Sequence, residues 1–353
     1  IINEDLSMCE LILGVKEIEP ELLISSKIYI FFSHTSKIQA DNSAAAQGTP
    51  GMDKKTLLKK ILKKNITLVD YENIRDDLSR RYLGFGRFAG IVGCYNSLNL
   101  YLQTIGYKTM PRAYELNSYD KLKNNIKNRD FKNVRIIVTG DGRVAKGALE
   151  FLKFSNIKNI SPEEYLQNNN TSAVFCNLST NYYVSRKDGG TFDLQNFINF
   201  PEMYVSVLDK YMSHTNMLIS AHYWDPKSPR LLKKNHIEKL LNLKVVGDIT
   251  CDVNGSIPTT SRSSTILNPY YYVDCKTLEE IKISNKSIAV MAVDNLPSEL
   301  PKDSSKEFGD GIIKEVLPYI IGKDDGRIKK ATIATNGNFL NNYKYLINYL
   351  NSP

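Results

Sequence analysis

One glycine turn constrains this chain more than any other feature. Residues 134–139 form an apolar, β-branched run, residues 140–145 read G-D-G-R-V-A, and an amphipathic helical pattern follows. This order predicts a strand, a tight turn and a helix, with the G-x-G-x-x-A spacing of a dinucleotide fingerprint. Gly140 permits the sharp turn, Gly142 lets a pyrophosphate approach the backbone, and the helix N-terminus offers free N–H groups. The predicted cofactor-binding residues are Gly140, Asp141, Gly142, Arg143 and Val144. The alternative is a glycine-rich turn of an α/β domain that binds nothing.

Strand and helix patterns alternate along the chain, which is typical of α/β proteins. The first part predicts three strands, at Leu11–Val15, Ile28–Phe32 and Ile66–Asp70. The middle part predicts six more, at Val134–Thr139, Ile157–Ile160, Ala173–Asn177, Met217–Ala221, Val245–Ile249 and Ser287–Val293. We therefore expect an α/β fold with two Rossmann-like domains, parallel sheets and an inter-domain cleft.

The helical segments set the expected domain boundaries. Phe88–Tyr101 is apolar with small residues, so it predicts a tightly packed helix, and Pro111 marks a boundary after it. Amphipathic patterns predict further helices at Ser304–Ile321 and Asn338–Leu350. We expect a catalytic domain of residues 1–106 plus 295–353, and an NAD(P)-binding domain of residues 107–294. Residues 43–51 are small and polar, and are interpreted as a loop foreign to the surrounding sequence.

Composition excludes several classes of protein. The net charge of +8 comes largely from lysine runs at 54–64 and 121–127, interpreted as solvated helix faces. Because no nucleic-acid module accompanies them, no nucleic-acid partner is expected. Five scattered cysteines without a CxxC pair, and four scattered histidines, predict neither disulfides nor a metal site and favour the cytoplasm. No apolar run reaches the roughly 20 residues of a membrane span, so a soluble protein is expected, with an oligomer left open.

Polar residues with acid–base chemistry follow the first three predicted strands. Lys16 and Glu17 follow the first, His34 the second and Glu72 the third. Ligand sites in α/β sheets gather at the carboxyl ends of strands, so these side chains are expected along one edge. Histidine is the side chain most often used as an acid–base group near neutral pH, whereas a lysine needs desolvation or a second cation to act as a base. Exposed loop residues without a catalytic role are the alternative.

The motifs at these strand ends resemble a known family, the lysine-forming saccharopine dehydrogenases. The first four matching segments are G-V-K-E at 14–17, F-F-S-H-T at 31–35, V-D-Y-E at 69–72 and G-F-G-R-F-A-G at 84–90. Four more continue in the same order: T-G-D-G-R-V-A-K-G-A at 139–148, Y-W-D-P at 223–226, C-D-V-N-G-S at 251–256 and A-V-D-N-L-P-S at 292–298. The set is most similar to the lysine–ketoglutarate reductase branch, and single motifs are shared with alanine dehydrogenase and transhydrogenase relatives.

The resemblance implies a reaction and a role for each matching residue. The family interconverts saccharopine with L-lysine and 2-oxoglutarate, using NAD(P). The resemblance implies Lys16 as the base for the secondary amine and His34 as the acid–base group of imine hydrolysis. It implies Glu17 and Glu72 as acidic neighbours that tune them. It also implies that Arg81 binds a substrate carboxylate and that Asp294 orients the substrate amine.

Two departures from the family pattern keep other functions open. A family strand with a carboxylate-binding arginine has no counterpart upstream of Ile1, and residues 43–51 interrupt a normally short region. The alternatives are an alanine dehydrogenase-like or other opine-type enzyme, and a non-catalytic nucleotide-binding homologue. The cofactor choice between NAD and NADP stays open, because residues 156–161 carry no acid to bind a ribose and Lys158 tolerates a 2′-phosphate.

Overall fold

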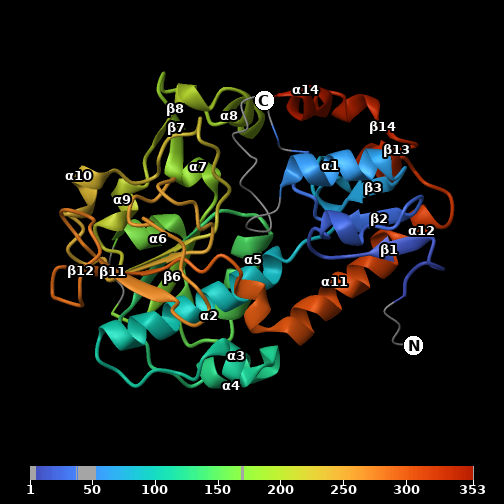
Figure 1. Ribbon diagram of the computed structural model, residues 1–353. Coiled ribbons are helices and arrows are strands. Elements are labelled where there is room, and N and C mark those ends of the chain that lie inside the picture. Colours follow the sequence, from blue (N-terminus) through green and yellow to red (C-terminus); the bar gives the residue numbers. More distant parts are fainter. Residues whose placement is uncertain (1–4, 37, 39–52, 168–170, 353) are drawn as a thin grey trace. The chain divides into compact units, whose positions relative to one another are not determined.

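The chain forms two compact units in the computed structural model, which describes residues 5–36, 38, 53–167 and 171–352 (Figure 1). The first unit comprises residues 1–84 and 307–353, and the second comprises residues 85–306. Residues 43–51, interpreted above as a loop, lie outside the described residues. The sequence predicts domain boundaries after 106 and before 295. Residues 85–106 instead join the second unit, because helix α2 (Gly86–Thr104) packs against α5 (Arg143–Leu152).

The first unit is built on a five-stranded sheet. Its order is β1 (Leu11–Leu13), β2 (Ile28–Phe31), β3 (Thr67–Asp70), β13 (Thr332–Thr335) and β14 (Asn338–Phe339). The first three strands are parallel, as expected, whereas β13 runs antiparallel to β3 and β14 antiparallel to β13. Because β1 to β3 are parallel, the residues that follow them gather at one edge of the sheet.

Short helices complete the first unit. They are α1 (Lys54–Lys63), α12 (Leu317–Ile320), α13 (Arg327–Ala331), α14 (Leu346–Asn351) and the single turns η1 (Pro20–Leu22), η2 (Tyr71–Asn73) and η5 (Asn341–Tyr343). Leu57, Leu58 and Ile61 of α1 pack with strand residues in one apolar core. Helix α11 (Pro301–Glu315) runs from residues of the second unit into the first.

The second unit contains a seven-stranded sheet with the order β11, β12, β10, β9, β4, β6, β5. In chain order these strands are β4 (Arg135–Thr139), β5 (Lys158–Asn159), β6 (Val174–Leu178), β9 (Met217–Ser220), β10 (Val245–Asp248), β11 (Tyr270–Asp274) and β12 (Ser287–Met291). All neighbours are parallel except β11 and β12. Every strand expected from 134 to 293 is present, to within two residues at each end.

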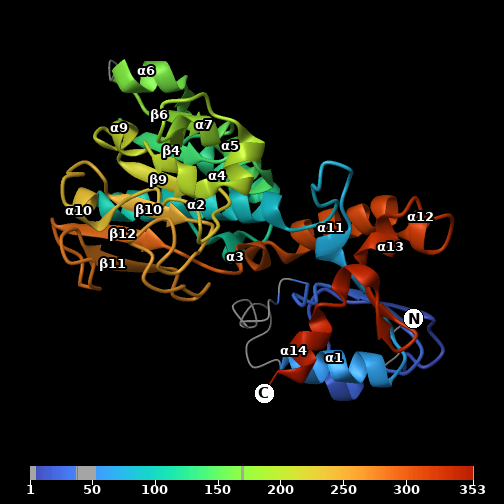
Figure 2. The ribbon, with the colours of Figure 1, turned by 90° about the horizontal axis from the view of Figure 1, so that it is seen from above.

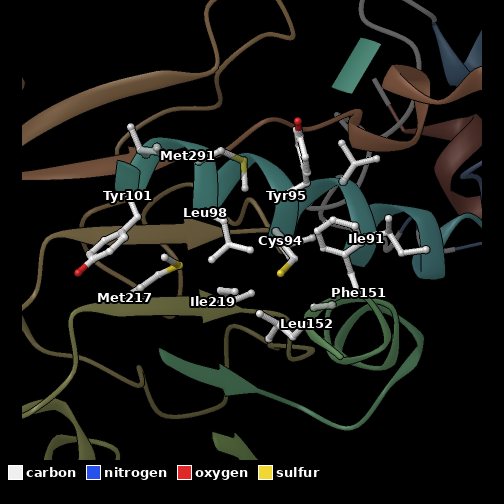
Figure 3. Close-up of a cluster of buried hydrophobic side chains, with 14 of the residues drawn as sticks. Ile91, Cys94, Tyr95, Leu98, Tyr101, Phe151, Leu152, Met217, Ile219 and Met291 are labelled. Carbon is white, nitrogen blue, oxygen red and sulfur yellow. The ribbon is translucent and has the colours of Figure 1, made fainter. Parts of the chain in front are cut away.

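The long helix α2 fixes the core of the second unit. Figures 1 and 2 show it lying along one face of the sheet. Figure 3 shows its apolar side chains between α5 and the strands β9 and β12, with Leu98 and Cys94 at the centre. A Cβ at Gly90 would lie 2.0 Å from the carbonyl oxygen of Val144, and one at Gly147 would lie 2.1 Å from that of Arg87. The glycines of both motifs therefore let two helix backbones meet, as the small residues of this helix predicted.

The remaining elements of the second unit are short. Its helices are α3 (Ala113–Leu116), α4 (Tyr119–Ile126), α6 (Pro162–Gln167), α7 (Thr180–Tyr183), α8 (Leu194–Asn199), α9 (Asp209–Met212) and α10 (Lys234–Ile237), with the turns η3 (Pro201–Met203) and η4 (Leu296–Glu299). A separate hairpin pairs β7 (Val184–Arg186) with β8 (Tyr204–Ser206). Among the helices of the described ranges, none combines the length and apolar character that crossing a membrane requires.

Two helix predictions near the C-terminus are wrong in part. The helix expected at Ser304–Ile321 is divided into α11 and α12, because Pro318 supplies no N–H to continue the first helix. The helix expected at Asn338–Leu350 is replaced by β14, a turn and the short α14. The apolar pattern there is met instead by packing against the first unit's core, which includes Phe339, Tyr343 and Leu346.

Candidate functional site

A buried charge cluster lies at the carboxyl edge of the first unit's sheet. Oε1 of Glu17, after β1, lies 2.8 Å from Nδ1 of His34, after β2. The same carboxylate oxygen accepts a hydrogen bond from Nζ of Lys54, the first residue of α1. Lys54 is 2% exposed and also donates to the carbonyl oxygen of Ser33 at 3.2 Å. The carboxylate of Glu17 therefore joins a buried cation to a half-buried imidazole.

The prediction of a solvated helix face for the lysines of 54–64 is wrong for Lys54, which is buried. Lys54 shares the buried stripe of Leu57, Leu58 and Ile61, because positions three, four and seven apart lie on one helix face. Burying an unpaired ammonium is costly, so the contact with Glu17 is what makes this placement stable. Lys54 was missed as a site residue, although its place in the apolar stripe was a visible signal.

A second carboxylate, Asp70, lies at the end of β3 beside this cluster. Oδ2 of Asp70 accepts a hydrogen bond from Oγ of Ser33 at 2.5 Å and from its N–H at 3.2 Å, while Oδ1 accepts one from the N–H of Glu72 at 2.8 Å. Burial raises the pKa of Asp70 to about 6, and the negative charge of Glu72 adds to the rise. Ser33 and Asp70 tie the ends of β2 and β3 together, and neither was predicted as a site residue.

Glu72 and Arg81 form a pair of their own. Nη2 of Arg81 lies 2.9 Å from Oε1 of Glu72, whose side chain is buried. The Arg81 side chain is 36% exposed, so part of its five-donor guanidinium faces solvent. The structure thus brings together two residues for which the resemblance implied roles. The guanidinium has N–H groups left to bind a carboxylate in the two-bond geometry that arginine favours.

Lys16 lies at the same sheet edge and is exposed. The backbone on both sides of it is fixed, because Gly14 donates to the carbonyl oxygen of Ile30 at 2.9 Å and Phe32 donates to that of Val15 at 3.1 Å. Four predicted residues of this unit, Lys16, Glu17, His34 and Glu72, therefore follow parallel strands, as the sequence predicted. His34 has a positive φ of 51°, an uncommon backbone conformation outside glycine that clusters at functional sites.

In the second unit the glycine turn joins β4 to α5, as predicted. Gly140 has a φ of +98°, and a Cβ there would lie 2.8 Å from the carbonyl oxygen of Ala221. Gly142, the N-terminal cap of α5, would place a Cβ in open space, with no atom of the described residues within 4 Å. Gly140 is thus required by the fold, whereas the protein itself does not require Gly142 to lack a side chain. A ligand backbone or pyrophosphate approaching the helix N-terminus does require it.

A hollow of about 220 Å³ opens at this turn. Its lining includes Gly140, Asp141 and Gly142, together with Thr180 after β6 and Trp224 after β9. Aromatic and aliphatic side chains of α7, α8 and the following loops complete it: Tyr183, Leu194, Phe197, Ile198, Tyr223 and Leu231. The order of the strands switches sides at β4, because β6 and β5 lie on one side of it and β9, β10 and β12 lie on the other. Sheets of α/β proteins bind ligands beside such a switch point. The hollow therefore lies where sheets of this kind bind nucleotides.

His222 follows β9 and is buried beside the glycine turn. Its Nδ1 lies 2.8 Å from Oγ1 of Thr139, and its Nε2 lies 2.9 Å from Oγ of Ser256. Burial lowers the pKa of His222 to about 4, so the imidazole is neutral at neutral pH. Because Thr139 ends β4, this histidine ties the strand before the turn to the loop after β10.

Asp294 follows β12 in the second unit and is exposed. Its charge, with those of Asp248 and Asp252, adds to the effect of burial in raising the pKa of the Cys251 thiol to about 12. Cys251 donates through Sγ to the carbonyl oxygen of Ala292 at 3.0 Å and is a protonated, partly buried thiol. Burial also raises the pKa of Asp252 to about 6.

The observed strand order alters the position at which a residue that binds the cofactor's ribose is expected. The spacing from the glycine turn predicts this residue near β5, but β5 is an edge strand and β6 is the neighbour of β4. Residues 179–183 after β6 contain no acid, and Asn177 donates to the carbonyl oxygen of Gly140 at 2.8 Å. Lys158 lies one strand away from β4, so it is not placed to read the ribose.

Comparison with known proteins defines the class first. Residues 193–341 match the family model for the alanine dehydrogenase/PNT C-terminal domain. The solved structure of an L-alanine dehydrogenase superposes with a TM-score of 0.55 at 12% identity, covering 97% of this chain and 81% of that one. The fold is therefore that of an α/β protein of the alanine dehydrogenase type.

Sequence relatives narrow this class further. The chain is 28% identical over 397 residues to the mitochondrial alpha-aminoadipic semialdehyde synthase of Bos taurus, covering 98% of this chain and 42% of the relative. It is 23% identical over 320 residues to saccharopine dehydrogenase [NAD(+), L-lysine-forming] of Neurospora crassa, covering 87% and 72%. The chain is a homologue of both groups, which confirms the resemblance seen in its motifs. It spans less than half the length of the synthases that it matches.

Proposed function

We propose that this chain is an NAD(P)-dependent oxidoreductase that interconverts saccharopine with L-lysine and 2-oxoglutarate. At a coarser level, the relatives support an amino-acid oxidoreductase of lysine metabolism with NAD or NADP as its cofactor. The observation that carries the proposal is the Glu17–His34 pair at the strand ends, in a chain whose glycine turn leaves Gly142 open. A fold likeness alone would support any dehydrogenase of this type.

The residues of the first unit supply the acid–base chemistry. When bound, NAD(P)⁺ accepts a hydride from the glutaryl α-carbon of saccharopine. Lys16 takes the proton of the secondary amine, which leaves a C=N bond between that carbon and the lysine nitrogen. His34, held through Nδ1 by Glu17, uses Nε2 to take a proton from the water that attacks this carbon. The same imidazole passes this proton to the nitrogen. It then carries the second proton of the added oxygen to the nitrogen as the C–N bond breaks, which leaves the ketone of 2-oxoglutarate and the free amine of lysine.

Binding and orientation fall to other residues. Arg81, partly held by Glu72, binds a substrate carboxylate with its exposed N–H groups. Asp294 orients the substrate amine. Gly140, Asp141, Gly142, Arg143 and Val144 hold the cofactor, with its pyrophosphate at the N-terminus of α5. Glu72 and Glu17 adjust the charge around the reacting groups.

A substrate-pair assay tests the proposal. The full chain is supplied with NADH or NADPH and with lysine plus 2-oxoglutarate, and dinucleotide oxidation is followed by absorbance. The proposal predicts oxidation only when both substrates are present. Oxidation with pyruvate and ammonia instead would assign an alanine dehydrogenase-like activity. Dinucleotide binding without turnover for any pair would assign a non-catalytic homologue.

A further inference from the structure

A second hollow, of about 470 Å³, lies in the second unit and shares Pro229 with the hollow at the glycine turn. Its walls come from the β7–β8 hairpin and from the loop after β9. Four of its lining side chains are basic, namely Lys187, Lys227, Arg230 and Lys233, and one is acidic, Glu202. With four basic groups against one acidic group, the hollow is strongly cationic.

The backbone that carries these cations is anchored. The N–H of Lys187 donates to the carbonyl oxygen of Met203 at 2.9 Å, at the end of the hairpin where the connecting loop begins and ends. Oγ of Ser206 donates to the carbonyl oxygen of Leu231 at 2.6 Å, which joins the hairpin to the loop after β9. The N–H of Leu231 in turn donates to the carbonyl oxygen of Ser256 at 3.0 Å. The basic side chains thus extend from fixed positions on two sides.

The four cations have no anionic partner among the residues that the structure describes. Within the described residues none of them forms an ion pair, whereas neighbouring charges are paired: Arg186 with Asp188 at 2.5 Å and His236 with Asp209 at 2.5 Å. Like charges around a hollow repel one another, and a bound anion removes that repulsion. Exposed lysines alone would be a solvated face, but these four surround a concave space beside a second hollow.

We propose that this basic hollow binds a phosphate group of a small molecule. Its position supports this ligand, because the hairpin follows β6 and the loop follows β9, the two neighbours of β4 in the sheet. Ligands of α/β sheets bind outside the carboxyl ends of such strands. Arginine and lysine are the side chains that phosphate recognition uses most. The phosphate belongs either to the dinucleotide, as the 2′-phosphate of NADP, or to a separate phosphorylated metabolite, and only the first source rests on the proposed function.

The test compares two charge-matched double variants of the full chain. Lys227→Gln/Arg230→Gln removes two cations from the hollow, and Lys276→Gln/Lys282→Gln removes two exposed cations elsewhere in the same unit. Dissociation constants for NADPH and NADH are measured by fluorescence at low ionic strength, where screening is weak. Binding of inorganic pyrophosphate is measured by calorimetry with NADH present, so that the glycine turn is occupied. Thermal midpoints of both variants verify folding.

The two sources give different results. If the phosphate is that of NADP, the hollow variant weakens NADPH about tenfold or more and leaves NADH within twofold. If it belongs to a separate ligand, both dinucleotides bind as in the unchanged chain and pyrophosphate binding is lost. The control variant keeps all three affinities in either case.

Other results overturn the proposal. Equal affinities of the unchanged chain and the hollow variant for NADPH, NADH and pyrophosphate would exclude a phosphate site. Equal weakening of NADPH and NADH, with pyrophosphate unchanged, would also exclude it, because it points to damage at the glycine turn. If the unchanged chain binds no dinucleotide, the proposed function fails, and the pyrophosphate measurement, then made alone, still decides on the hollow.

Discussion

The carboxylate of Glu17 lies 2.8 Å from Nδ1 of His34, although the two residues follow different strands. Parallel pairing of β1 with β2 brings them together, and the ammonium of Lys54 reaches the same carboxylate from α1. A charge-assisted contact of this kind fixes the imidazole ring and leaves Nε2 to act on a substrate. The histidine is therefore oriented before any ligand binds.

Removing one charge of the buried Glu17–Lys54 pair is expected to lower the free energy of unfolding more than removing both charges. Glu17→Gln leaves the Lys54 ammonium buried without a carboxylate, so we expect the free energy of unfolding to fall by about 3–5 kcal/mol. The double variant Glu17→Gln/Lys54→Met removes both charges and is expected to lose clearly less. Urea unfolding measures both, with Lys55→Met, a half-buried neighbour, as the control. A double variant that loses more stability than Glu17→Gln alone would contradict the pairing of Glu17 with Lys54.

Substitutions at the two glycines of the turn are expected to have different effects, one on stability and the other on dinucleotide binding. Gly140→Ala is expected to destabilise the chain by more than about 1 kcal/mol, because its φ is +98° and its Cβ meets the carbonyl of Ala221. Gly142→Ala is expected to change stability by less than about 1 kcal/mol and to weaken NAD(P)H binding about tenfold or more. Thermal melts and fluorescence titrations measure these effects. Unchanged dinucleotide affinity in Gly142→Ala would remove this turn from the binding site.

The residues of the candidate site show how much of it can be predicted from the sequence. Strand ends were predictable because β-branched runs stop at polar residues, so Glu17, His34 and Glu72 were found. Lys54 was not predicted, because a run of lysines is typical of a solvated helix face and the place of Lys54 in the apolar stripe was not considered. His222 was hidden because burial beside two hydroxyls depends on contacts with Thr139 and Ser256, which lie far away in the chain.

The strand order could not be predicted for a related reason. Rossmann topology places the second strand beside the first, whereas here β6 takes that place and β5 lies at the edge. Strand β5 is only two exposed residues long, so it has little apolar surface to hold a central position. The β7–β8 hairpin was missed because its strands are three residues each, too short for a period to be seen.

Asp70 is expected to make stability fall as pH rises. Its folded pKa of about 6 lies above its ordinary value of 3.8, so the folded state holds more protons than the unfolded state between these values. The free energy of unfolding therefore decreases from pH 4 to pH 6, by up to about 3 kcal/mol from this group. Asp70→Asn is expected to lack this decrease when unfolding is compared across that range. Parallel pH profiles of the two proteins would show that Asp70 ionises normally.

His222 is expected to act in the opposite direction. Its folded pKa of about 4 lies below the ordinary 6.5, so the unfolded state binds more protons between these values and stability is lost as pH falls. We expect His222→Asn to remove up to about 3 kcal/mol of this acid dependence. Urea unfolding at pH 4.5 and pH 7.5 measures the difference. His236→Asn, which changes a half-buried histidine, is the control, and an equal effect of both variants would contradict the account.

Deuterium transfer tests the central claim most directly. The full chain is given lysine, 2-oxoglutarate and NAD(P)H that carries deuterium at the reactive carbon of the nicotinamide, and products are analysed by mass spectrometry and NMR. The account predicts saccharopine with one deuterium on the glutaryl α-carbon. The variants His34→Gln and Lys16→Met are expected to form this labelled product more slowly than the unchanged chain. No labelled saccharopine, together with labelled alanine from pyruvate and ammonia, would contradict it.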